Sequence, residues 1–533
     1  MMSERLSRVK ITLIPVLAAF FIYLAVQNGV VAAGGGQPQP LKVRDILLVY
    51  DDILSEKARR DVAAIADMLT YMGYGTGYAG MSRSVDLLGS FSHVLLYHES
   101  GEIGSDFLKG LGKLDSKIMA VGGGDISALA GFLEPDIQSQ SLENATAQFF
   151  YTFDGGGQVS GLTGKQNMLI LKGRFPYSDG YMNINGQTVP LFAEKGRFSA
   201  MAAFDSGSDQ LKAVLAEQVS RWKWPYSNAP GSFDQYIVFD GVYPFTDPRK
   251  LMETVQLMKK SDLSYAITVM PVYRNGEYPA MKHFCEILRY AQANGAAVFL
   301  KAPLINTGNP TAGDINGKIS AAFDIYVSYG VYPIAIEAPN NWIHGEPGLS
   351  VLRRFRTVLL TPDQAESSWS DRTGYNTVYS DGHQFIAPAL TGGDPGGNMV
   401  RSYPTALFMD IGAETDVLEE TLERIRLSGI PLKSLWNSSH TVYTDSRVLN
   451  YERGILTLDG QVKPLDFIPF EYDTYFEYNR GIIGRMAESI ARENRRLLLA
   501  VSVISVIFAV FIAIARYQNR KRFLYREDKS NDR

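Results

Sequence analysis

Polar and charged side chains stand directly after several short apolar runs in the second half of the sequence. Asp240, Lys301 and Glu337 each follow a run that is typical of a buried β-strand. Two carboxylates with one ammonium can act as an acid–base pair, so these three residues are the catalytic candidates. The alternative is an internal ion-pair network that only closes the fold.

The other polar residues near the ends of such runs are the candidates for substrate binding. They are Tyr273, Arg274, Asn340, Asn341, Trp342, Asp381, His383, Asp410 and His440. Carboxylates and amides bind hydroxyl groups, and a tryptophan ring stacks on the face of a pyranose. The set therefore predicts a sugar-binding site.

A repeated strand–helix pattern over residues 235–480 must position these side chains. The expected strands are Tyr236–Phe239, Tyr265–Met270, Ala297–Leu300, Pro333–Ile336, Thr357–Leu360, Thr377–Tyr379, Thr405–Met409 and Leu432–Trp436. The expected helices are Pro248–Lys260, Ala280–Asn294, Ile315–Tyr329 and Glu414–Ser428. Repeated β/α units of this length predict a closed or nearly closed (β/α) barrel, whose active site lies at the C-terminal ends of the strands.

The first half of the chain predicts a separate α/β domain over residues 41–147. Strands at Asp45–Tyr50, His93–Tyr97 and Lys117–Val121 alternate with helical spacing such as that in Ser55–Met72, which predicts a parallel sheet with helices on its faces. Residues 148–230 alternate apolar runs with Gly- and Asn-rich breaks, which predicts a β-rich insertion and connection. The glycines at 122–124 favour a tight turn over a ligand-binding loop.

The layout of this half is similar to a flavodoxin-like or amidotransferase-like domain. An amidotransferase needs a cysteine nucleophile, but the sole cysteine, Cys285, lies among apolar residues on an expected helix of the second half. We therefore assign the domain no such activity and expect Cys285 to be a core residue without a disulfide partner.

Both ends of the chain carry membrane-type segments. Basic residues precede the apolar run Ile11–Val26, and small residues follow it, so residues 1–33 predict a signal peptide or an uncut signal-anchor. The apolar run Leu497–Ala515 predicts a transmembrane helix, because a helix of that length spans about 30 Å, roughly one hydrocarbon core. The basic segment 516–533 predicts a cytoplasmic tail, which leaves an extracytoplasmic body at the cell membrane. Two buried core helices of a soluble protein are the alternative.

The charge balance narrows the range of partners. The 533-residue chain carries 52 Lys and Arg against 56 Asp and Glu, a net charge of −4. Without residues 1–33 and 497–533, 42 basic and 52 acidic residues remain, a net charge of −10. Because such a surface repels a phosphate backbone, we expect no nucleic-acid partner, whereas neutral or cationic glycans remain compatible.

Three stretches of the second half resemble the polysaccharide deacetylase superfamily. They are Ile237–Pro248, which reads IVFDGVYPFTDP, then Ala266–Tyr273, and then Phe284–Gly295. The resemblance covers residues 235–440 and is closest to an uncharacterised membrane-anchored branch of the superfamily. It implies a (β/α) barrel at the cell surface and a role beside exopolysaccharide synthesis and export. A membrane glycosyltransferase or an export complex fits as a partner.

The chain departs from the family pattern at the metal site. Active members carry two adjacent aspartates after the first strand, where this chain has Asp240-Gly241. They carry two histidines four residues apart after the third strand, where this chain has Lys301 and Ile305. A hydrolytic metal ion needs about three protein ligands and an open position. We therefore expect no metal or other cofactor, and we hypothesise that a Lys301–Asp240 ion pair replaces the metal centre.

Three functions stay open at this point. The resemblance implies a deacetylase-like protein without its metal centre that binds, modifies or helps export an exopolysaccharide or envelope glycan. The second is an active hydrolase, either a deacetylase with an unorthodox metal site built from Asp240, Asp247, His383 or His440, or a glycosidase that uses Asp240 and Glu337. The third is a purely structural envelope protein.

Overall fold

The computed structural model describes most of the body of the chain. The described residues are 45–153, 158–223, 234–304, 311–361 without 345, 383–388, 403–427, 432–465 and 516, with the backbone alone at 374–376. Nearly all of them belong to one compact unit, 1–467, and a second unit covers 468–533. In the part of the chain that is described, no helix is long and apolar enough to cross a membrane. The expected segments 1–33 and 497–515 lie outside the described residues.

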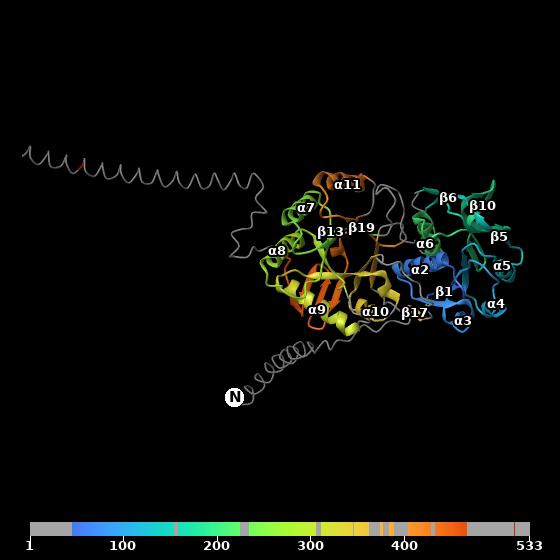
Figure 1. The fold of residues 1–533 in the computed structure, drawn as a ribbon, viewed down its shortest axis with the longest axis horizontal. Helices are drawn as coiled ribbons and strands as arrows, with labels where there is room; N and C mark the ends of the chain where they lie inside the picture. The colour runs from blue at the N-terminus through green and yellow to red at the C-terminus, as the bar shows by residue number, and fades with distance from the viewer. Residues whose placement is uncertain are drawn as a thin grey trace, which may run out of the picture. The chain divides into compact units, whose positions relative to one another are not determined.

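A ten-stranded sheet occupies the first half of the larger unit (Figure 1). Its parallel strands are β1 (Ile46–Tyr50), β2 (Thr76–Gly80), β3 (His93–Tyr97), β4 (Lys117–Val121) and β11 (Phe198–Met201). Its antiparallel continuation is β10 (Gln187–Lys195), β9 (Tyr177–Ile184), β6 (Gln148–Thr152) and β7 (Gln158–Leu162). A separate pair consists of β5 (Gln138–Ala145) and β8 (Gln166–Lys172). Because β11 pairs with both β4 and β10, most strands of the expected β-rich insertion extend the parallel sheet.

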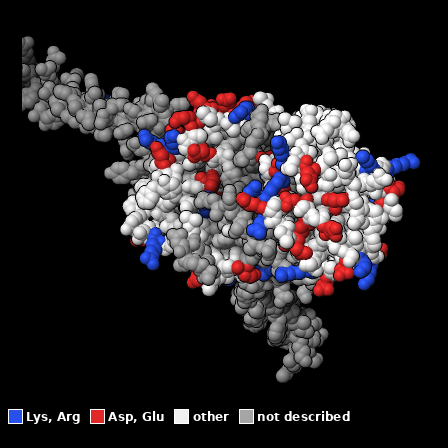
Figure 2. Space-filling model, turned by 45° about the vertical axis from the view of Figure 1, so that its right-hand side comes forward, with Lys and Arg blue, Asp and Glu red and all other residues white. Residues whose placement is uncertain are grey.

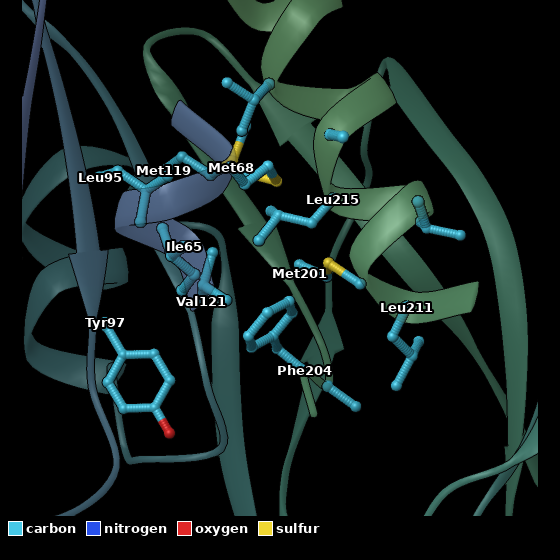
Figure 3. Packing of buried hydrophobic residues seen from close by; sticks show 14 of the residues in the cluster. Ile65, Met68, Leu95, Tyr97, Met119, Val121, Met201, Phe204, Leu211 and Leu215 are labelled. Carbon is cyan, nitrogen blue, oxygen red and sulfur yellow. The ribbon is translucent and has the colours of Figure 1, made fainter. Parts of the chain in front are cut away.

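Two apolar cores cover the two faces of the parallel strands. Along β1, Ile46 and Leu48 enter one core, and Leu47 and Val49 enter the other. The helices of this half are α2 (Glu56–Tyr71), α3 (Met81–Ser84), η1 (Leu88–Ser90), α4 (Ser105–Gly112), α5 (Ser127–Leu133) and α6 (Asp209–Lys223). Side chains of α2 and α6 pack over β3, β4 and β11 in the first core, as Figure 3 shows. This burial on both faces explains why the strands read as continuous apolar runs.

The sequence did not predict strand β2, which the structure contains. It reads TGYAG, yet all five of its residues are buried. A Cβ on Gly77 would lie 2.4 Å from Cζ of Phe91, so the aromatic ring fills the space that a side chain on β2 would occupy. The apolar contacts of this strand therefore come from its neighbours and leave no pattern in its own sequence.

The glycine run after β4 packs against the backbone of two neighbouring segments, at His98 and at Asn167. A Cβ on Gly122 would lie 2.4 Å from the carbonyl oxygen of His98, and a Cβ on Gly123 would lie 1.9 Å from that of Asn167. Gly122 also has a φ of +107°, which favours glycine. The glycines thus let two backbone segments approach closely at this turn.

Seven parallel strands close a barrel in the second half of the unit (Figure 1). They are β12 (Gln235–Val242), β13 (Tyr265–Val269), β14 (Ala296–Lys301), β15 (Pro333–Pro339), β16 (Thr357–Thr361), β18 (Gln384–Pro388) and β19 (Thr405–Met409). The helices are α7 (Pro248–Lys260), α8 (Pro279–Ala293), α9 (Ala312–Ser328), η2 (Asn340–His344), α10 (Gly348–Leu352) and α11 (Thr415–Leu427). Local signals start several of them, since Asp247 caps α7 and Thr311 forms a capping box with Asp314 at α9.

Two of the eight expected barrel strands differ from the structure. The expected strand at 377–379 lies outside the described residues, and β18 takes the sixth position of the barrel. The expected eighth strand is wrong. Leu432 makes a single bridge to Gln235, and the chain then turns into the short helix η3 (Leu435–Asn437), where the Ser434 side chain accepts a hydrogen bond from the backbone N–H of Trp436. The barrel closes instead through the pairing of β19 with β12.

A small antiparallel sheet follows the barrel strands. It contains β20 (His440–Tyr443), β21 (Val448–Glu452), β22 (Ile455–Leu458) and β23 (Gln461–Val462). The backbone N–H of Arg356 donates to the carbonyl of Thr441, which attaches this sheet to the chain just before β16.

Several contacts join the barrel to the ten-stranded sheet within the same compact unit. The tenth strand of the large sheet, β17 (Gly374–Asn376), comes from the connection between β16 and β18 and pairs antiparallel with β2. Asn340 donates a hydrogen bond to the Asp67 carboxylate of α2 over 3.2 Å, and the rings of Tyr71 and Tyr403 lie 5.7 Å apart. Helix α2 therefore contacts both the segment after β15 and the segment before β19.

Replacing Gly123 with alanine tests the close packing after β4. The added methyl group would overlap the backbone carbonyl of Asn167, so we expect the unfolding free energy of Gly123→Ala to fall by about 2–3 kcal/mol. Gly131→Ala in α5 is the matched control. Nothing lies within 4 Å of its added Cβ, and helix propensity predicts a gain of up to about 1 kcal/mol. Urea denaturation measures both variants, and equal stabilities would contradict the packing argument.

Candidate functional site

Three strands of the barrel bring one ammonium group between two carboxylates. The Lys301 Nζ atom lies 2.6 Å from Oδ1 of Asp240 and 2.7 Å from Oε1 of Glu337. Lys301 and Glu337 are paired residues on the neighbouring parallel strands β14 and β15, so their side chains lie on the same face of the sheet. The ion pair expected from the sequence is thus present, and Glu337 joins it.

An irregularity in β12 places Asp240, the third member of the triad formed by Lys301, Glu337 and Asp240. The pairing of β12 with β13 shifts register between Phe239 and Val242, which leaves Asp240 and Gly241 outside the regular ladder. Gly241 has a φ of +69°, a conformation that glycine adopts readily. Such a bulge bends the strand and changes the direction of a side chain at its edge. The Asp-Gly dipeptide was the available sequence signal for this bulge.

The three side chains differ in their exposure to water. Glu337 is 1% exposed, whereas Lys301 is 29% and Asp240 is 38% exposed. The site therefore has a buried carboxyl on one side of the ammonium and a partly solvated carboxylate on the other. Any ligand that enters from solvent meets Asp240 before it meets Glu337.

Burial controls the protonation of this site. It raises the pKa of the Glu337 carboxyl to about 7, an effect that the Lys301 ammonium opposes and the Asp240 carboxylate reinforces. Burial alone would lower the pKa of Lys301, but Glu337 and Asp240 together raise it above its ordinary value. Near neutral pH, Lys301 is therefore charged while Glu337 exchanges a proton. The formal charge of the triad then alternates between zero and −1.

The described side chains around Lys301 do not form a metal-binding site. Among the described residues, no three His, Cys, Asp or Glu side chains come together as a possible ligand set. The ammonium of Lys301 occupies the position between Asp240 and Glu337 and already supplies the positive charge that these carboxylates require.

Two residues of the hypothetical unorthodox metal site serve the fold instead. The Asp247 carboxylate accepts the backbone N–H of Arg249 and caps α7. His440 is fully buried, with Nδ1 bonded to the Thr357 hydroxyl at 2.8 Å and Nε2 to the carbonyl oxygen of Leu435 at 2.6 Å. Burial also lowers the pKa of His440 to about 4. Because both ring nitrogens are engaged in the fold, we leave His440 out of the candidate site.

The remaining sequence candidates have different surroundings. Asn340 is buried and held by Asp67, and the Asp410 carboxylate accepts the backbone N–H of Gly412 ahead of α11. The other described candidates follow β13 or β15 or precede β18. Tyr273, Trp342 and His383 are partly buried there, and Arg274 and Asn341 are exposed. Asp381 lies outside the described residues.

Exposed aromatic side chains lie near the same strand ends and were not among the sequence candidates. Tyr243 and Phe245 directly follow β12 and are 46% and 76% exposed. Phe408 on β19 is 37% exposed and is paired with Val238, so it lies on the same face of the sheet as Asp240. The exposed Tyr-Pro-Phe string was the signal for the first two, whereas Phe408 reads as an ordinary core residue.

Comparisons with known proteins find distant likenesses to solved structures. No protein-family profile and no curated protein matches the chain. A CE4 family pseudoenzyme from Bacillus anthracis aligns with 39% of this chain and 66% of its own chain, just under two thirds, at 9% identity and a TM-score of 0.25. A ThuA-like protein from Bacteroides uniformis aligns with 35% of this chain and 93% of its own, at 6% identity and a TM-score of 0.28. The N-terminal domain of mmIFT52 aligns with 34% and 98%, at 11% identity and a TM-score of 0.25. Likenesses this low carry no argument, so the function is argued from the site itself.

Removing the ammonium tests the ion-pair triad. Lys301→Met leaves a buried carboxyl beside a second carboxylate, so we expect the unfolding free energy to fall by about 2–3 kcal/mol. This loss is smaller than that for a fully buried ion pair, because Lys301 keeps contact with water. Lys433→Met is the control, since Lys433 pairs with Asp234 in an exposed position, and we expect a change of less than about 0.5 kcal/mol. Equal losses in urea denaturation would show that the triad does not stabilise the barrel.

The raised pKa of Glu337 makes the stability of the fold depend on pH. Folded Glu337 keeps its proton up to about pH 7, whereas the unfolded side chain releases it near its ordinary pKa of 4.5. This contribution to stability is therefore complete below about pH 4.5 and is lost as the pH rises through about 7. Glu337→Gln removes the titration, so the wild type should lose about 2–3 kcal/mol relative to this variant between about pH 5 and about pH 8. Urea denaturation across this range checks the slope, and a constant difference would contradict a raised pKa.

Proposed function

We propose that this chain is an extracytoplasmic, membrane-anchored protein that handles an exopolysaccharide or another envelope glycan. It binds the glycan without a metal centre at the barrel mouth, which is the end of the barrel where Asp240, Lys301 and Glu337 lie. The observation that carries the proposal is the position of Lys301, whose ammonium contacts both carboxylates of the site. The membrane anchoring rests on the sequence of the two ends alone.

The groups around the triad suit a polyhydroxylated ligand. The partly exposed Asp240 carboxylate accepts hydrogen bonds, and hydroxyl groups are donors that can reach it. Phe408 offers an exposed aromatic surface on the same face of the sheet, and Tyr243 and Phe245 extend this surface beyond β12. A polar anchor with aromatic surfaces beside it is a common arrangement in ligand sites.

The charge of the protein limits the kind of glycan. The body carries the net charge of −10 derived above, and Figure 2 shows acidic side chains gathered with interspersed basic ones on the face turned forward. Such a surface favours neutral or cationic glycans over acidic ones. A membrane glycosyltransferase or an export complex remains our proposed partner.

An active glycosidase is the second candidate function. A buried carboxyl with a pKa of about 7 beside a second carboxylate is what a general acid requires. However, Lys301 contacts both groups and fills the space that an attacking water or a sugar carbon would need. For this reason we prefer binding to hydrolysis. A purely structural role would leave the triad as an internal ion pair without any ligand.

Titration with neutral and cationic oligosaccharides tests the proposed function. We expect the full-length protein to bind at least one of N-acetylated chito-oligosaccharides, cello-oligosaccharides and chitosan oligosaccharides in calorimetry. Asp240→Asn should raise the Kd about tenfold, since it weakens hydrogen bonds to a charged acceptor. Phe408→Ala should weaken binding as well.

Glu452→Gln is the matched control for these variants. It removes an exposed carboxylate on β21, outside the site, and should leave the Kd unchanged. Absence of binding to every oligosaccharide would favour the structural alternative. Stoichiometric zinc in the purified protein, together with release of acetate from the N-acetylated oligosaccharide, would favour a deacetylase instead.

A further inference from the structure

The triad holds one ammonium for two carboxyl groups that need it to different degrees. Glu337 is 1% exposed, so its ionised form has almost no water to stabilise it and depends on Lys301. Asp240 is 38% exposed, so water stabilises its carboxylate in addition to Lys301. Lys301 lies within 2.7 Å of both, which means that the protonation of one carboxyl changes what the ammonium offers to the other.

Two charge states follow from this geometry. When Glu337 is protonated it needs no counter-ion, and Lys301 forms a neutral pair with Asp240. When Glu337 is ionised, the buried charge attracts Lys301 more strongly than the solvated one does. Asp240 is then the less compensated carboxylate, and it faces the side from which a ligand enters.

We propose that Glu337 is a proton-operated positioning residue, which engages Lys301 when ionised and thereby frees Asp240 to accept hydrogen bonds from the hydroxyl groups of a ligand. The inference rests on the proposed glycan binding and adds its regulation. Ligand binding and proton release from Glu337 are then coupled, and each must favour the other to the same extent.

Among the described residues, the charged groups that affect Glu337 come from two other strands of the barrel. Its charged neighbours are Lys301 of β14 and Asp240 of β12. Its paired residue on β16 is the apolar Leu359, and Thr268 of β13, on the same face of the sheet, is uncharged. Asp67 of α2, a charged residue of the other half, accepts a hydrogen bond from Asn340 after β15.

The protonation of Glu337 also falls in a useful range. Its pKa of about 7, raised by burial, places the change in charge where small shifts in external pH alter the populations of both states.

The test uses a ligand that does not itself titrate. An N-acetylated chito-oligosaccharide should bind the full-length protein at least about fivefold more tightly at about pH 8.5 than at about pH 5.5. Glu337→Gln keeps the size of the side chain but not its charge, so its affinity should be independent of pH and match the weak, low-pH value of the wild type. Glu452→Gln should keep the wild-type profile. An affinity that does not change with pH in the wild type, or that changes equally in Glu337→Gln, would overturn the proposal.

A second measurement separates this inference from the proposed function. Infrared difference spectra of the ligand-free wild type against Glu337→Gln should show the band of a protonated carboxyl at low pH, which disappears as the pH rises through about 7. Absence of that band would overturn the proton switch even if a glycan binds. A titrating band without binding of any oligosaccharide would instead overturn the proposed function, and the coupling to a ligand with it.

Discussion

The ammonium of Lys301, shared between a buried and a partly solvated carboxylate, is the interaction on which the rest of the barrel mouth depends. A buried Glu337 without a counter-charge would have to stay protonated, and two adjacent carboxylates would repel each other. With Lys301 in place, both carboxyl groups can lie in one site at a moderate cost in folding free energy. The same contact places a positive charge between the two carboxylates, so the electrostatics of the site depend on one side chain.

Three different structural devices bring this triad together. The register between β14 and β15 sets Lys301 beside Glu337. A bulge at Gly241 takes Asp240 out of the ladder of β12 and turns it toward them. The chain after β15 is then held by Asn340, which bonds to Asp67 on α2. The barrel mouth is therefore supported by the ten-stranded sheet as well as by its own strands, and core residues such as Tyr403 join the two.

Much of the fold could be predicted from local patterns. The strand at Thr405–Met409 and the helix at Pro248–Lys260 have the bounds expected from the sequence, because apolar period and capping residues are local signals. The errors arose where local signals are weak. β2 has glycines in place of an apolar pattern, and the expected eighth barrel strand leaves the sheet after one bridge at Leu432. Contacts with distant segments decided both cases.

The sequence by itself determined the class of the fold, the absence of the paired aspartates and histidines of the deacetylase pattern, and an ion pair between Lys301 and Asp240. Only the tertiary structure decided that Glu337 shares this ammonium, that His440 and Asp247 serve the fold, and that Phe408 is paired with Val238 on the strand that carries Asp240. The physical reason is that residue type fixes charge and hydrogen-bonding capacity. Burial and strand register fix which of those groups meet and how strongly water screens them, and both arise from segments far apart in the chain.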